Sequence, residues 1–82
     1  MERILCKTFP EVGEEVEVYD GPGMPLILGK VVELGGATQP NTPRRVWFEV
    51  ITCRAGLNYS GRMWLYWEQN VNGISIFRVR YI

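Results

Sequence analysis

The chain has 82 residues, a hydrophobic fraction of 46% and a charged fraction of 22%, which is typical of one folded domain over residues 1–82 and excludes a disordered chain. It contains no histidine, the usual general base and the usual partner of a nucleophilic serine or cysteine, so we do not expect an enzyme. Two cysteines, Cys6 and Cys53, without a paired spacing predict reduced thiols, no metal site and no cofactor.

No apolar run approaches the ~20 residues of a membrane span. Residues 1–7 are too short and too charged for a signal peptide. A cytoplasmic location without membrane contact is therefore expected.

The net charge is zero, but the charges are unevenly distributed. Residues 1–35 hold seven acids and three bases, a net charge of −4, whereas residues 36–82 hold six arginines and two acids, a net charge of +4. In one interpretation the two halves pair with each other across a small barrel. In the other, an arginine-rich side faces an acidic partner.

The first half of the chain predicts short strands joined by turns. Residues 3–8 alternate weakly and could form a short edge strand. Residues 14–20 alternate clearly, with valines on the inner face and an acidic, solvated outer face. Residues 20–25 are rich in glycine and proline and form a loop. The apolar residues 24–28 are expected to pack over the end of the core, before a strand at residues 30–34.

The second half begins with a long polar loop over residues 35–43. Residues 46–53 predict a central strand, because both of its faces are partly apolar. A connection over residues 54–61 leads to a long C-terminal β-hairpin over residues 62–82. No helix longer than a single turn is expected.

The hairpin register depends on its turn. Asn70-Val71-Asn72-Gly73 suits a type I turn followed by a glycine bulge, which gives the three-residue loop 71–73. The alternative is the two-residue loop Asn72-Gly73, which shifts the pairing by one residue and exchanges the faces. The three-residue loop is preferred, because only that register separates apolar from charged residues.

In the preferred register, one side of the hairpin is apolar and consists of Met63, Leu65, Trp67, Phe77, Val79 and Tyr81. The other side places Trp64 and Tyr66 beside Arg80 and Arg78, with Trp47 on the neighbouring strand. Tryptophan, tyrosine and arginine are enriched at the centres of protein interfaces. The predicted partner-binding residues are Trp64, Tyr66, Arg78, Arg80, Trp47, Arg62, Arg44 and Arg45.

These features predict a non-catalytic binding module that contacts a protein partner through the aromatic and arginine face and the 35–45 loop. One alternative is a module for single-stranded RNA or DNA, in which bases stack on the aromatic rings and arginines contact phosphates. The zero net charge gives little general attraction for phosphate. A second alternative is a structural subunit that forms a homo-oligomer through the same face. An accessory or phage-type protein would fit these features.

Two strand segments carry a resemblance to a known architecture. The segment Gly13-Glu14-Glu15-Val16-Glu17-Val18 is followed by a loop and by Gly29-Lys30-Val31-Val32-Glu33-Leu34, which resembles the opening of many SH3-like barrels. The resemblance covers about a quarter of the chain and implies an all-β fold, a five- to six-stranded antiparallel barrel, without implying a function.

Overall fold

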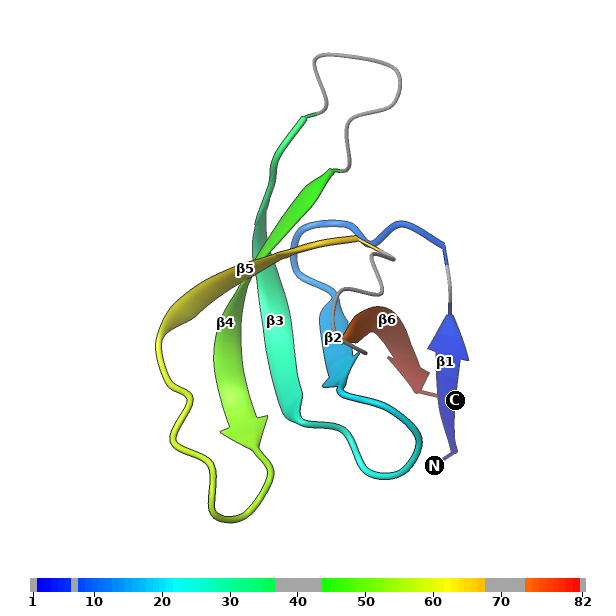
Figure 1. Ribbon diagram of the computed structural model, residues 1–82. Helices are drawn as coiled ribbons and strands as arrows, with labels where there is room; N and C mark the ends of the chain where they lie inside the picture. Colours follow the sequence, from blue (N-terminus) through cyan, green and yellow to red (C-terminus); the bar gives the residue numbers. More distant parts are fainter. Residues whose placement is uncertain (1, 7, 37–43, 68–73, 82) are drawn as a thin grey trace.

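The structure, a computed structural model, describes residues 2–6, 8–36, 44–67 and 74–81 (Figure 1). These residues form one six-stranded antiparallel sheet with the order β1-β6-β2-β3-β4-β5. Its strands are β1 (Arg3–Cys6), β2 (Glu15–Tyr19), β3 (Ile27–Leu34), β4 (Arg45–Cys53), β5 (Arg62–Tyr66) and β6 (Ser75–Tyr81). The sheet confirms the all-β prediction. It is open rather than closed, with β1 and β5 as its two edges.

The described segments contain no helix long and apolar enough to cross a membrane. The expected strands are present, although β3 begins at Ile27, earlier than predicted. β1 is an edge strand and β4 lies between β3 and β5, as their patterns predicted.

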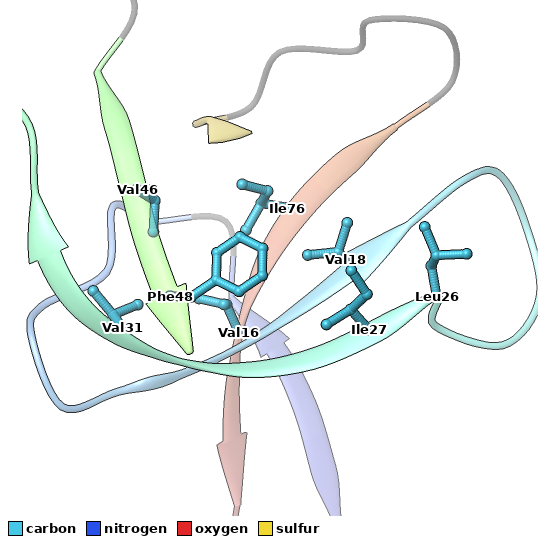
Figure 2. Packing of buried hydrophobic residues seen from close by; sticks show 8 residues of the cluster. All are labelled: Val16, Val18, Leu26, Ile27, Val31, Val46, Phe48 and Ile76. Carbon is cyan, nitrogen blue, oxygen red and sulfur yellow. The ribbon is translucent and has the colours of Figure 1, made fainter. Parts of the chain in front are cut away.

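The core lies on one face of the curved sheet, here called the core face. Figure 2 shows the ring of Phe48 near the middle of the buried cluster, between residues of β2, β3 and β6. Phe48 is fully buried, and truncating a buried phenylalanine costs about 3–5 kcal/mol. The cluster consists of Val16, Val18, Leu26, Ile27, Val31, Val46, Phe48 and Ile76.

Gly29 allows β3 and β4 to pack this closely. A Cβ atom placed on Gly29 would lie 2.6 Å from Cδ2 of Phe48 and 3.2 Å from the carbonyl oxygen of Glu49. The register shifts between Leu28 and Gly29, where β3 pairs with β4. The missing side chain therefore makes room for the Phe48 ring against the backbone of β3.

The predicted C-terminal hairpin is wrong. β5 pairs with β4, whereas β6 pairs with β1 on one side and with β2 on the other. In the sheet, β2, β3 and β4 lie between β6 and β5 (Figure 1). The turn residues that were to fix the register, residues 70–73, lie outside the described residues. The partners of β6 are distant in sequence, and a local turn pattern carries no information about such partners.

The predicted faces are confirmed for β5, whereas those of β6 are exchanged. Met63 and Leu65 pack against the core, and Trp64 lies on the opposite side. In β6, however, Ile76 belongs to the core and Phe77 lies on the outer face, where its ring contacts Tyr19. This exchange follows from the pairing of β6 with β2, because Ile76 lies opposite Val18, a core residue.

The outer side of β2 is not a solvated acidic edge as predicted. Glu17 is fully buried, and its carboxylate accepts a hydrogen bond from the hydroxyl of Tyr19. Phe77 of β6 lies directly opposite Glu17, and the rings of Tyr19 and Phe77 meet edge to face at 5.6 Å. β2 lies between two other strands of the sheet. Aromatic side chains therefore cover Glu17, which the β2 sequence alone predicts to be exposed.

The acidic and basic halves of the chain pair with each other. Each of the three ion pairs among the described residues joins an acid from residues 1–35 to an arginine from residues 36–82. The pairs are Arg54–Asp20, Arg62–Glu33 and Arg78–Glu14. These contacts favour the interpretation in which the two halves neutralise each other within one domain.

The Arg54 side chain ties the loop after β2 to the end of β4. Its guanidinium donates to both carboxylate oxygens of Asp20, at 3.0 and 3.5 Å, and to the carbonyl oxygen of Met24. Leu26 at the end of this loop packs in the core as predicted, but Met24 is 72% exposed. Cys53, beside Arg54, and Cys6 are free thiols on β4 and β1, strands separated by three others.

A candidate aromatic and arginine interface

Five side chains gather on the outer side of β4 and β5, on the face opposite the core. Because side chains alternate between the two faces of β4, Phe48 points into the core and its neighbour Trp47 points outward. Trp64 of β5 lies directly opposite Trp47, and Tyr66 lies directly opposite Arg45. We call this group the β4–β5 face; it consists of Arg45, Trp47, Arg62, Trp64 and Tyr66.

The three aromatic rings of the face form a continuous row. The ring centroids of Trp47 and Trp64 lie 6.1 Å apart with the planes tilted by 46°. The rings of Trp64 and Tyr66 meet edge to face at 5.2 Å. Such pairs contribute about 0.5–1.5 kcal/mol each beyond the area they bury, so the row is a fixed surface rather than three independent side chains. Trp64 still leaves 39% of its surface exposed.

Two arginines lie over this aromatic row. The guanidinium carbon of Arg45 is 4.7 Å from the ring centroid of Trp64 and 6.0 Å from that of Tyr66. The guanidinium carbon of Arg62 is 4.9 Å from the ring centroid of Trp47. Contacts of this kind contribute about 0.5–1 kcal/mol at exposed sites.

The two arginines differ in their charge partners. Arg62 forms an ion pair with Glu33, which lies opposite Trp47 on β3. Within the described part of the chain, Arg45 has no carboxylate at ion-pair distance. Arg45 is therefore held over Trp64 with a positive charge that an external acceptor can reach.

The sequence did not indicate the role of Glu33. Its position became clear only from the pairing of β3 with β4, which is interrupted by a register shift between Val31 and Glu33. Without this shift, simple alternation from Val31 to Glu33 would place both on one face. Val31 is instead buried in the core while Glu33 is exposed beside the β4–β5 face.

Three of the predicted site residues do not belong to this group. Arg44 lies over the ring of Phe9, with its guanidinium carbon 3.9 Å from the centroid. Arg78 and Arg80 lie on β6, which three strands separate from β5 in the sheet, and on the same side of β6 as the core residue Ile76. The structure therefore does not bring Arg78 and Arg80 together with Trp64 and Tyr66.

Arg78 has a structural environment of its own. It lies opposite Cys6 of β1, and its Nε atom is 3.1 Å from a carboxylate oxygen of Glu14. A hydrogen bond with the Cys6 side chain, and then the charge of Glu14, raise the pKa of Arg78 above its ordinary value. Through Glu14, Arg78 links β6 to the segment before β2.

Taken together, the β4–β5 face offers flat aromatic surface and guanidinium donors on two adjacent strands that the core holds rigidly from behind. This combination suits the recognition of an exposed macromolecular surface. Searches among known protein families, curated proteins and solved structures find no match for the chain. Its class is that of a small all-β domain.

Proposed function

We propose that the protein is a non-catalytic binding module that contacts a protein partner through the β4–β5 face. The observation that carries this proposal is the position of Arg45 over Trp64, exposed and without a carboxylate partner among the described residues. Exposed tryptophan next to an arginine is typical of the centre of a protein interface. A partner that places a carboxylate by Arg45 and covers Trp64 would satisfy both groups.

The 35–45 loop is part of the same proposal. Its residues 37–43 lie outside the described residues, but it ends at Arg44 and Arg45, at the start of β4. The amide of Gly35, at the described start of the loop, donates to the carbonyl of Arg45 at 2.9 Å, which supports a role of the loop beside the β4–β5 face. A cytoplasmic location is also proposed, supported by the two free thiols, since disulfides are rare in that compartment.

A relationship to SH3-like barrels remains part of the proposal. It is supported by the two strands that carry the resemblance, β2 and β3, which pair in antiparallel fashion with Val16 opposite Gly29. Such a fold would present strands and loops for binding without defining the ligand.

Capture from cell extract with the immobilised chain tests the function. Trp64→Ala should lower retention of the partner by about 30-fold, the equivalent of a hot-spot loss of about 2 kcal/mol. Tyr59→Ala is the matched control, because Tyr59 is also 39% exposed but lies in the connection before β5. Circular dichroism of each variant establishes that it is folded.

A second pair of variants tests the arginine. Arg45→Ala should weaken capture, and Arg80→Ala, which removes an exposed arginine from β6, should not. Equal retention by Trp64→Ala and Tyr59→Ala would contradict the proposal. Capture that is lost after nuclease treatment and falls steeply with salt would instead identify a nucleic acid as the partner.

A further inference from the structure

β5 is an edge strand whose hydrogen bonds to β4 follow a fixed alternation. The amide of Trp67 donates to the carbonyl of Arg44, and the amide of Val50 donates to the carbonyl of Gly61, each at 2.9 Å. The pairing between these two bonds runs without a register shift. Hydrogen-bonded pairs alternate with non-bonded pairs in an antiparallel ladder. Every second residue from Gly61 to Trp67 therefore directs its backbone groups toward β4.

The remaining residues of β5 direct their backbone groups out of the sheet. These residues are Arg62, Trp64 and Tyr66, and their amide and carbonyl groups have no hydrogen-bond partner among the described residues. An edge of this kind is a template for another strand. The same three residues carry the outward side chains of the β4–β5 face, so an added strand would extend that face.

Within the described residues, the edge carries few of the features that usually prevent pairing. Natural edge strands are protected by charged side chains, especially lysine, by proline, by a bulge, by a charge pointing inward, or by a segment that covers the edge. β5 has the sequence Arg-Met-Trp-Leu-Tyr, which contains neither lysine nor proline, and it pairs with β4 without a bulge. Its one charged side chain, Arg62, already forms an ion pair with Glu33 on the outer face.

The sequence of β5 is complementary to itself in one antiparallel register. With the two-fold axis at Trp64, Trp64 lies opposite Trp64 of the second copy, and Arg62 lies opposite Tyr66. On the core face, Met63 then lies opposite Leu65. In this register, all three residues with unpaired backbone groups on each edge form hydrogen bonds to the other copy. No two like charges lie opposite each other, an arrangement that would be destabilising. Moving the axis to Arg62 would oppose two arginines.

We propose that the β5 edge binds a second copy of this chain, through antiparallel pairing of the two β5 strands about Trp64. The pairing joins two six-stranded sheets into one continuous sheet. It also joins the two β4–β5 faces, so that the aromatic row continues from one copy into the other. The pairing uses backbone groups at the edge and does not depend on the function proposed above.

The register predicts which positions can be cross-linked. Residues of a hydrogen-bonded antiparallel pair have Cα atoms about 5.5 Å apart, within the range of about 4.4–6.8 Å that a disulfide spans. Position 62 of one copy should therefore form a disulfide with position 66 of the other. Two copies of position 62 would be displaced by four residues, about 13 Å along the strand, which is too far.

The experiment uses two single-cysteine variants, Arg62→Cys and Tyr66→Cys, each in a background with Cys6→Ser and Cys53→Ser. Under mild oxidation, a product of twice 9.5 kDa should form when the two are mixed and should be absent from each variant alone. A mixture that gives no more product than the separate variants would overturn the proposal. Circular dichroism first confirms that both variants are folded.

Sedimentation of the unmodified chain gives an independent test. The mass should rise from 9.5 kDa toward twice that value as concentration increases. Trp64→Lys should abolish this rise in mass, because the two lysines at position 64 would lie opposite each other at the two-fold axis and repel. Met24→Lys, at a residue 72% exposed in the loop after β2, should leave the rise unchanged. A mass that remains at 9.5 kDa up to millimolar concentration would overturn the proposal, whether or not a protein partner is captured.

Discussion

Gly29→Ala tests the packing that orients the β4–β5 face. The new Cβ would lie 2.6 Å from Cδ2 of Phe48, well inside the ordinary contact distance of about 3.5–4.0 Å between carbon atoms. The ring must move by about 1 Å in a closely packed core, and such overpacking costs typically 1–3 kcal/mol. For a domain of this size, a loss of 2 kcal/mol lowers Tm by roughly 8–16 °C.

Chemical and thermal unfolding measure this change. Gly36→Ala is the matched control, because a Cβ on Gly36 meets no atom within 4 Å. Adding Phe48→Leu should be less destabilising in the Gly29→Ala background than in the wild type, since the smaller side chain relieves the clash. A Gly29→Ala variant as stable as the wild type would refute the account of how β3 and β4 pack, and with it the outward orientation of Trp47.

Two further substitutions test contacts outside the core cluster. Tyr19→Phe should lower the free energy of unfolding by about 1–3 kcal/mol in urea titrations, because it removes a donor to the buried carboxylate of Glu17. A loss no larger than that of an exposed tyrosine would contradict the role of this hydroxyl. Arg54→Ala should cost about 1–2 kcal/mol, since it removes the pair with Asp20 and the bond to the Met24 carbonyl. It should also speed proteolysis of the loop after β2; unchanged cleavage would show that Arg54 does not hold this loop.

Sequence patterns were sufficient for the elements whose two faces differ in polarity. Val16 and Val18 were placed in the core by simple alternation, and Trp64 was placed on the outer side of β5 in the same way. Turn and strand patterns are local, so they could locate the strands. β4 was placed in the interior of the sheet because both of its faces carry apolar residues.

The pairing partners could not be predicted in this way. The hairpin prediction depended on an Asn-Gly pattern within residues 70–73, but the neighbours of β6 are β1 and β2, more than fifty residues earlier. β6 carries apolar residues on both faces, so alternation alone could not decide whether Ile76 or Phe77 faces the core. The structure resolves this through the pairing of Ile76 with Val18.

The wrong hairpin prediction affected only part of the predicted binding site. Trp47, Trp64 and Tyr66 came together because they lie on the adjacent strands β4 and β5, a pairing that did not require the hairpin. Arg78 and Arg80 had been added to the site solely through the hairpin register. Arg45 takes their place over Trp64, since its position opposite Tyr66 follows from the pairing of β4 with β5.

The most direct test of the proposed binding face is photo-crosslinking from a single position in living cells. A photoreactive phenylalanine analogue is placed at Trp64 in one variant and at Tyr59 in another, two positions with the same exposed fraction of 39%. We predict a discrete adduct with a partner protein from position 64 and none from position 59. Adducts of equal yield from both positions, or none from position 64, would contradict the assignment of the β4–β5 face as the binding surface.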